Sequence, residues 1–354
     1  MPRISNILEK GFGLFTIGNR AFTPPFYAVI EVNDRCCLRC KQCNLWKTSK
    51  GFHGDSKGKQ LSPSEIVKTI RDIRKWNPLT KTLMFCGGEP FLEKEIFRYV
   101  RVAKKLDFFT TITTNGFLIN EEMAFEIVDS GLDELCFSLD APFAEIHDDI
   151  RGVKGSFERV MKANEFINKA KTQLGKEKPN LKINTVISNI NYKYLAEMPV
   201  LLKKMGINEY SAQYITVMRP EIKAYVDKMF RREVSPSQWI LPDEFLVPKE
   251  DERGFWKVIE NLKRNAKREG INLSLRLYDK VQPCSILWGS LLVDNYGNVF
   301  PCTMIRDQAG NVRNREFKDI WNHPRMKRVR SLFNARKLDP VCKRCCIYPN
   351  VIFR

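Results

Sequence analysis

The sequence lacks any apolar run long enough to cross a bilayer, since its longest apolar runs are only strand length. Its N-terminus, MPRISNILEKGFGLF, has neither a continuous apolar segment nor a small-residue cleavage site, and is therefore a poor signal peptide. No internal repeat or low-complexity segment is present, which excludes collagens and coiled coils. Histidine is scarce, and His147 and His323, which have no ligand-like neighbours, are expected at the surface or as capping residues. A globular, cytoplasmic protein is expected.

Cysteine is present in unusual number. The eleven cysteines fall into two groups near opposite ends of the 354-residue chain, with Cys86 and Cys136 alone between them. Without a secretion signal, close spacing favours metal ligation or redox chemistry over disulfides. Cys86 and Cys136 lie in predicted strands and are expected to be small core residues.

Short β-branched runs alternate with amphipathic stretches from Phe26 to about Asp279, a pattern that predicts repeated βαβ units and a parallel sheet. The expected strands are 26–32, 82–87, 109–116, 134–140, 182–188 and 209–217, with a further one at 271–278. The expected helices include 63–76, 92–106, 194–206 and 254–269. The fold class is therefore α/β, a (β/α)6-type partial TIM barrel, with its chemistry at the carboxyl ends of the strands.

Four segments follow from this pattern. Residues 1–25 are expected to form a strap on the barrel, with contact to a membrane surface as the alternative. Residues 26–279 form the barrel. Within them, the irregular insertion 218–253, which carries Tyr225, Phe230 and Trp239, is a candidate substrate lid. Residues 280–354 form a small, loop-rich extension.

The first cysteine group directly follows the first predicted strand. Cys36, Cys40 and Cys43 form a C-x3-C-x2-C loop, which supplies three thiolates to a [4Fe-4S] cluster and leaves one iron open for a ligand. A structural zinc site would need four ligands, and Cys37 is not spaced to be the fourth.

Motifs after the later strands extend this pattern in chain order. They are CGGEP at 86–90, TTNG at 113–116, SLDAPFAEIHDDIRGVKGSFERV at 138–160 and INTVISNIN at 183–191. Together with the cysteine loop, they resemble the radical S-adenosylmethionine (radical SAM) superfamily. One departure is Gln42, where family members often carry an aromatic residue before the third cysteine.

The resemblance implies which residues hold S-adenosylmethionine. The GGEP backbone would hold the methionyl amino group, Ser138 and Arg151 would contact the ribose and the carboxylate, and the 183–191 segment would line the adenine. The expected cofactor contacts are Gly87, Gly88, Glu89, Pro90, Asn115, Ser138, Asp140, Arg151 and Val186. An Arg fork suits a carboxylate, and glycines permit close backbone approach.

The second cysteine group resembles the SPASM/twitch extension of radical SAM enzymes, through Cys284-x12-Gly297-x4-Cys302 followed by Cys342 and Cys345. These four thiolates could hold one auxiliary [4Fe-4S] cluster or a zinc ion. Cys346 is the alternative ligand to Cys345. With all four iron sites ligated, an auxiliary cluster would transfer electrons rather than bind substrate.

Positive charge is concentrated near the end of the chain, since residues 306–354 hold thirteen Lys and Arg against four Asp and Glu. Such a surface suits an acidic or phosphate-bearing substrate, nucleic acid or an anionic membrane, or serves solubility alone. No aromatic-interleaved RNA motif is present. The family resemblance adds a one-electron donor of the flavodoxin or ferredoxin type.

The resemblance implies an enzyme that reductively cleaves S-adenosylmethionine to a 5′-deoxyadenosyl radical, which abstracts hydrogen from the substrate. We expect an oxidation or C–H modification of a peptide or protein side chain, that is, an oxidoreductase or maturase. The alternative is a dehydrogenase, epimerase or C–C bond-forming enzyme acting on a small alcohol, a sugar or a lipid headgroup. A non-catalytic, zinc-binding nucleic-acid protein accounts only for the charge and the cysteines.

Overall fold

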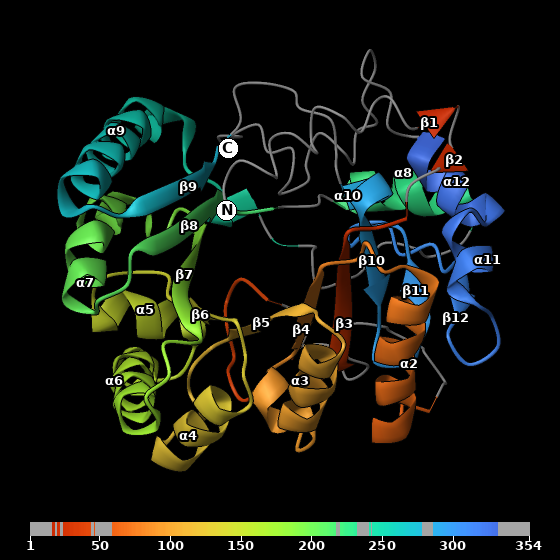
Figure 1. Ribbon diagram of the computed structural model, residues 1–354. Helices are drawn as coiled ribbons and strands as arrows, with labels where there is room; N and C mark the ends of the chain where they lie inside the picture. The colour runs from red at the N-terminus through yellow and green to blue at the C-terminus, as the bar shows by residue number, and fades with distance from the viewer. Residues whose placement is uncertain are drawn as a thin grey trace.

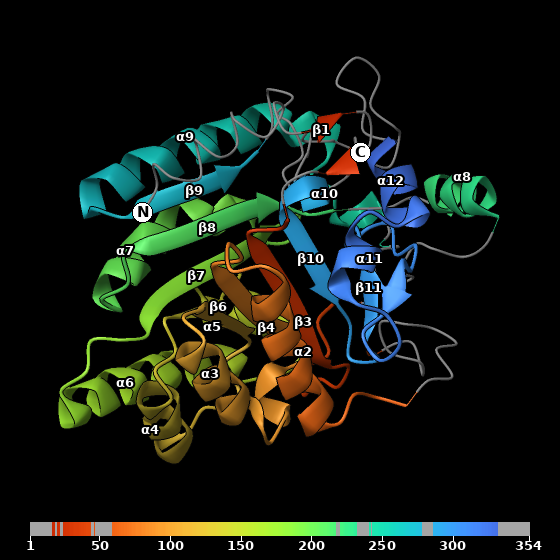
Figure 2. The same ribbon diagram turned by 45° about the vertical axis from the view of Figure 1, so that its right-hand side comes forward.

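A ten-stranded, curved sheet organises the computed structural model (Figures 1 and 2). The structure describes residues 16–17, 20–21, 24–43, 46, 59–216, 220–231, 241, 243–277 and 286–331. The strand order is β12-β11-β10-β3-β4-β5-β6-β7-β8-β9. The strands are β3 (Tyr27–Asn33), β4 (Thr82–Gly87), β5 (Phe109–Thr114), β6 (Glu134–Ser138), β7 (Asn180–Ile187), β8 (Glu209–Tyr214), β9 (Asn272–Arg276), β10 (Ser290–Val293), β11 (Asn298–Phe300) and β12 (Gly310–Asn311).

Helices cover the convex side of the barrel strands, and others pack at the β10–β12 end of the sheet (Figures 1 and 2). They are α2 (Pro63–Trp76), α3 (Ile96–Lys105), α4 (Glu121–Asp129), α5 (Ala144–Arg151), α6 (Ser156–Leu174), α7 (Met198–Lys204), α8 (Pro220–Phe230), α9 (Glu252–Glu269), α10 (Ile286–Gly289), α11 (Phe317–Trp321) and α12 (Pro324–Ser331). Among the described residues, no helix combines the length and apolar character needed to cross a membrane. The expected partial barrel with a C-terminal extension is confirmed.

Helix α2 has the bounds that its sequence predicts. Ser62 caps its N-terminus in a capping box with Glu65, which offsets backbone N–H groups that have no partner inside the helix. Ile66, Ile70 and Ile73 recur at helical spacing and are buried against the sheet. The 63–76 prediction succeeds because its cap and its apolar stripe agree.

Strand alternation determines which side chains face the barrel interior. In β7, Leu181, Ile183 and Ile187 are buried in the core shared with the helices. Lys182 and Asn184 alternate with them, are half-buried, and face the concave side of the sheet. The concave side of β7 therefore carries polar side chains at these two positions.

The sheet continues from the barrel into the extension. Strand β10 pairs in parallel with β3, and β11 and β12 add antiparallel strands beyond it. Arg306 of the extension forms a bidentate, buried ion pair with Glu31 of β3, at 2.5 and 3.0 Å. The 26–279 and 280–354 segments thus share one sheet.

The expected irregular insertion at 218–253 contains a helix, α8, so this part of the prediction is wrong. Val226 and Phe230 lie one helical turn apart and are both buried, which explains the helix. The Arg328 guanidinium of α12 lies 4.6 Å from the Phe230 ring centroid, so Phe230 packs toward the extension. Tyr225 is exposed, and Trp239 lies outside the described residues.

The expected N-terminal strap is described only in part. Strands β1 (Thr16–Ile17) and β2 (Arg20–Ala21) form a short antiparallel pair. Ala21 exchanges two backbone hydrogen bonds with the Asn322 side chain, at 3.0 and 2.9 Å. The Pro25 carbonyl accepts hydrogen bonds from Asn77 and Thr80 beside the start of β4. Residues 1–15 lie outside the described residues.

Candidate functional site

The carboxyl ends of β3 to β7 bring most of the predicted site residues to one end of the barrel. Asn115, directly after β5, reaches the cysteine loop that follows β3. Its Nδ2 lies 3.8 Å from Cys36 Sγ and 3.5 Å from Cys37 Sγ. An amide donor at this distance stabilises thiolate charge.

Gly87 and Gly88 have a role that the sequence did not indicate. A Cβ on Gly87 would lie 2.2 Å from the Asn33 carbonyl oxygen, and one on Gly88 would lie 2.0 Å from that of Arg35. Gly88 N also donates to the Asn33 carbonyl at 3.0 Å. The close approach made by this turn is therefore to the base of the cysteine loop.

Glu89 is buried and is held by the protein itself. Its carboxylate accepts hydrogen bonds from Thr114 Oγ1 at 2.7 Å, Asn115 N at 2.8 Å and Phe91 N at 3.2 Å. Burial raises the pKa of Glu89 to about 6, although these hydrogen bonds oppose the shift. Pro90 begins the buried 3-10 turn that follows, Pro90–Leu92. Glu89 thus joins the turn after β4 to the end of β5.

Asp140 and Arg151 form a buried ion pair beside the cysteine loop. Arg151 Nη2 lies 2.9 Å from Asp140 Oδ2, and its Nη1 lies 3.9 Å from Cys40 Sγ. Burial raises the pKa of Asp140, and the Arg151 charge opposes that shift. Asp140 Oδ1 also accepts the Val186 N–H at 3.0 Å. The pair therefore connects the ends of β6 and β7 to the cysteine loop.

The C-terminal end of α5 docks directly on that loop. Arg39 N donates to the Arg151 carbonyl at 3.2 Å, and Lys41 N donates to the Ile150 carbonyl at 2.8 Å. Gly152 has φ +68°, and a Cβ there would lie 2.3 Å from the Arg39 carbonyl oxygen. Only glycine accommodates both the left-handed conformation and this contact.

Two residues of this site were missed by the sequence analysis. His147 was expected at the surface or as a cap, which is wrong: it is 1% exposed, and its Nδ1 accepts the Asp140 N–H at 3.1 Å. Burial lowers the pKa of His147 to about 3, so its imidazole is neutral. Asn191, fully buried, donates to the carbonyls of Asp140 at 2.7 Å and Val186 at 2.9 Å. Both residues lie inside the motifs quoted from the sequence, where their polar character was the available signal.

The remaining predicted cofactor contact is Ser138. Ser138 ends β6, is half-buried, and pairs in register with Asn184. Gln42, at the position where an aromatic is common, donates to Ser188 Oγ at 3.0 Å. This bond ties the cysteine loop to the end of β7.

The three thiols of the loop suit an iron–sulfur cluster by their chemistry. Within the described ranges, no three His, Cys, Asp or Glu side chains are already gathered at metal-binding distance. However, Cys40 lies beside the Arg151 cation, whose Nε is buried and has no acceptor among the described residues. Arg151 therefore has capacity for an additional anionic ligand. Cys36, Cys40 and Cys43 occupy one loop in this setting, and the residues fit the cluster and its ligand.

Cys37 interacts with the neighbouring cluster ligand, Cys36, and with Asn115. A hydrogen bond between the two thiols raises the pKa of Cys36 and, with the Asn115 amide, lowers that of Cys37 to about 7.

Cys86 and Cys136, the two cysteines outside both groups, differ in burial. Cys136 is buried as expected, whereas Cys86 is half-buried.

The auxiliary site is described only at Cys302, which follows β11 and accepts the Met304 N–H at 3.3 Å. Cys284, Cys342, Cys345 and Cys346 lie outside the described residues.

Known proteins match the chain over most of its length. A chain from Oleidesulfovibrio alaskensis named AdoMet-dependent heme synthase is 24% identical, covering 89% of this chain and 78% of its own length. Its namesake from Methanosarcina barkeri is 26% identical, covering 89% and 86%. Streptococcus suis SuiB, solved bound to the precursor peptide SuiA, superposes with a TM-score of 0.64 at 17% identity, covering 92% of this chain and 70% of SuiB.

Two family models complete the comparison. Residues 30–187 match the radical SAM superfamily, and residues 284–346 match the SPASM iron–sulfur cluster-binding domain. The first range contains the cysteine loop and the Asp140–Arg151 pair, and the second contains all the expected auxiliary ligands. The radical SAM domain implies a [4Fe-4S] cluster with S-adenosylmethionine, and the SPASM domain implies auxiliary iron–sulfur binding. The chain belongs to the radical SAM superfamily and carries a C-terminal SPASM extension.

Proposed function

We propose that this enzyme binds a [4Fe-4S] cluster through Cys36, Cys40 and Cys43 and holds S-adenosylmethionine beside Arg151. The observation that carries the proposal is the placement of the buried Arg151 guanidinium between Asp140 and Cys40. When bound, the cluster and S-adenosylmethionine supply one-electron C–S cleavage and hydrogen abstraction from a substrate C–H bond.

The protein's own residues position these groups. Arg151 would donate to a carboxylate through its remaining hydrogen-bonding capacity, which includes Nε, while Asp140 holds Nη2. The Val186 amide and the Ser138 hydroxyl lie at the neighbouring strand ends, where the ribose and the adenine would bind. The conformation of the cysteine loop is set chiefly by Gly87, Gly88, Glu89 and Asn115. Pro90 shapes the turn after β4.

The proposed substrate is a peptide or protein side chain, and the proposed reaction is its oxidation or C–H modification. The polar side chains of Lys182 and Asn184 on the concave side of β7 are compatible with a polar peptide segment at this end of the barrel. The fold shared with SuiB, which was solved with a precursor peptide, is consistent with it.

A second candidate is favoured by the curated relatives. Two proteins named AdoMet-dependent heme synthase align over 89% of this chain. The corresponding substrate would be a tetrapyrrole precursor of heme.

The proposed auxiliary cluster would be held by Cys284, Cys302, Cys342 and Cys345, with Cys346 as the alternative to Cys345. Four thiolate ligands would leave no iron open, so the site would accept the electron that the substrate radical loses as it is oxidised. A flavodoxin or ferredoxin is the proposed electron donor to the first cluster.

The test uses anaerobically reconstituted full-length protein. We expect about eight irons per chain, as two cubes require, and 5′-deoxyadenosine after addition of dithionite and S-adenosylmethionine. Replacing Cys36, Cys40 and Cys43 together with Ala should halve the iron and abolish 5′-deoxyadenosine formation. The matched control is Cys86→Ala with Cys136→Ala, which should retain both. Zinc in place of iron, or nucleoside formation in the triple variant, would contradict the proposal.

The two substrate candidates are separated by product. Peptide substrate pools should give a mass change on a side chain, whereas heme precursors should give heme. Heme formation without peptide modification would replace the first candidate with the second.

A further inference from the structure

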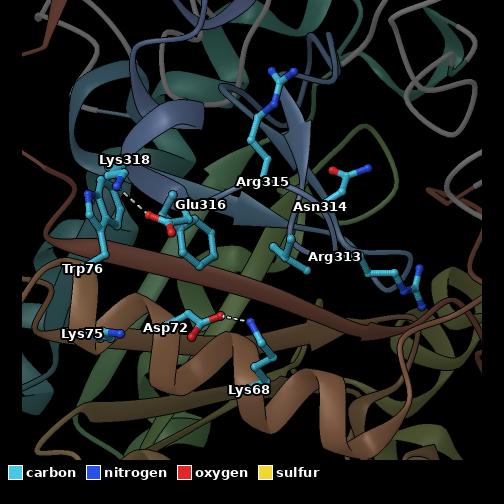
Figure 3. Close-up of a pocket in the computed structure, with 11 residues that line it drawn as sticks. Lys68, Asp72, Lys75, Trp76, Arg313, Asn314, Arg315, Glu316 and Lys318 are labelled. Atoms are coloured by element: carbon cyan, nitrogen blue, oxygen red, sulfur yellow. Dashed lines mark hydrogen bonds and ion pairs between the residues drawn. The ribbon is translucent and has the colours of Figure 1, made fainter.

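A groove of about 780 Å³ lies between the barrel and the extension, outside the proposed cofactor site (Figure 3). One wall is the outer face of α2, with Lys68, Asp72, Lys75 and Trp76. The other is segment 312–318, which follows β12. Because the walls are more than two hundred residues apart in the sequence, the groove exists only when the extension is docked on the barrel.

Positive charge exceeds negative charge along the groove. Its lining contains Lys68, Lys75, Arg313, Arg315 and Lys318 but only two carboxylates, Asp72 and Glu316. Figure 3 shows each carboxylate paired with one lysine: Lys68 with Asp72 at 2.5 Å and Lys318 with Glu316 at 2.8 Å.

The remaining cations differ in their partners. Arg313 is paired with Glu65 of α2, at 2.5 Å. Lys75 and Arg315 are exposed, and no carboxylate of the described residues lies within ion-pair distance of either. Arg315 points away from α2 in Figure 3, and its Nη1 donates to the Ala309 carbonyl at 3.5 Å. Because this partner is neutral, Arg315 and Lys75 both retain a positive charge for an anionic ligand that lies along the groove.

The mixture of charges determines which anion fits. Asp72 and Glu316 would repel a continuous phosphate backbone, which carries a charge at every nucleotide. A polypeptide with spaced carboxylates can contact Lys75 and Arg315 while placing neutral residues opposite Asp72 and Glu316. Trp76 is half-buried and stacks on Phe317 with ring centroids 5.6 Å apart, which adds an apolar wall for such a chain.

We propose that this groove binds an acidic segment of a polypeptide substrate, remote from the side chain that is modified. The assignment of this polypeptide as the substrate rests on the proposed function, whereas the binding itself does not. Lys75 and Arg315 are the residues that determine specificity for the acidic segment.

The experiment measures direct binding to the reconstituted full-length protein. The probe is a fluorescein-labelled peptide of alternating Glu and Ser, followed by fluorescence anisotropy at low salt. The Lys75→Glu, Arg315→Glu double variant should bind about tenfold more weakly or worse, and added salt should weaken wild-type binding. A Gln/Ser peptide should not bind.

The matched control reverses the same types of charge elsewhere. Lys204 of α7 and Arg264 of α9 are exposed, and their helices lie at the opposite end of the sheet from α2 (Figure 1). Lys204→Glu with Arg264→Glu changes net charge equally and should alter the affinity by about twofold or less.

Equal weakening in both double variants would overturn the proposal, because binding would then reflect net charge alone. Tighter binding of a labelled oligo-dT with the same dependence on Lys75 and Arg315 would overturn it in favour of nucleic acid. Dithionite-driven 5′-deoxyadenosine formation should be unchanged in both double variants. Its absence from the wild type would count against the proposed function and not against the groove.

Discussion

Both ends of the barrel bury a carboxylate beside a cation, but they compensate its charge differently. At the amino end of β6, Asp133 is 1% exposed and pairs with Lys104 and Lys178, whose side chains are 31% and 55% exposed. At the carboxyl end, Asp140 pairs with Arg151, which is itself only 13% exposed. The amino end lets its cations remain hydrated, whereas the carboxyl end buries both partners.

The pKa values of the carboxyls follow the same division. Burial alone would raise the pKa of Asp133, but hydrogen bonds from Lys104, Lys178 and Thr110 outweigh it and lower the pKa. Burial raises the pKa of Asp140 and that of Glu89. The ionised carboxylate is thus stabilised at the amino end of the barrel and destabilised at the carboxyl end, where the cofactor is proposed to bind. Binding sites commonly hold groups in such unfavourable states at a cost in folding stability.

The largest expected effect is at the turn that supports the cysteine loop. Gly88→Ala would place a Cβ 2.0 Å from the Arg35 carbonyl oxygen, so the turn or the loop must move. We expect a loss of about 4 kcal/mol or more of unfolding free energy, together with loss of iron at the first cluster. Urea unfolding and iron analysis measure both.

The control for this prediction is Gly254→Ala, in helix α9, where the added Cβ has no neighbour within 4 Å. It should stabilise the protein by about 0.5–1 kcal/mol. Normal iron content in Gly88→Ala would show that the close packing of this turn is dispensable.

The next prediction compares the buried carboxylates at the two ends of the barrel. Asp140→Asn leaves the buried Arg151 charge uncompensated and should cost about 3–5 kcal/mol. Asp133→Asn leaves lysines that water can solvate and should cost about 1–3 kcal/mol. Equal losses in urea unfolding would remove the distinction between the ends. S-adenosylmethionine affinity should fall only in Asp140→Asn.

The contribution of Glu89 to folding stability depends on pH. Because its pKa is raised from 4.5 to about 6 in the folded chain, the folded state binds a proton more tightly than the unfolded state. Its contribution to stability therefore falls as pH rises from about 4.5 to 6, by about 2 kcal/mol. The difference between wild type and Glu89→Gln, measured without the cluster, should change by this amount over that window. A constant difference would mean that burial does not shift this carboxyl.

The smallest effect concerns His147. His147→Phe removes the acceptor for the Asp140 N–H and should cost about 1–2 kcal/mol. His147→Asn, which retains an acceptor, should recover part of this loss if its side chain reaches the same amide. Equal unfolding free energies for the two variants would assign the effect to ring packing.

The sequence predicted features whose causes are local. The cap and apolar stripe of α2 and the strands of the barrel depend on neighbouring residues, and the structure contains them. It could not show that β10 pairs with β3, or that Gly88 packs on Arg35, because both involve chain segments far apart. His147 was misassigned because its partner, the Asp140 backbone, is set by the turn after β6 and not by a side-chain pattern.

The Arg306–Glu31 pair has a consequence for how the chain matures. Glu31 is part of the first barrel strand, but its cation is supplied about 275 residues later. A nascent chain that has released only the barrel from the ribosome lacks Arg306, and with it the bidentate ion pair that this buried carboxylate makes in the complete fold. The barrel should therefore reach its final stability only after the extension has been synthesised, and a gene fragment ending before residue 306 should yield an aggregation-prone product.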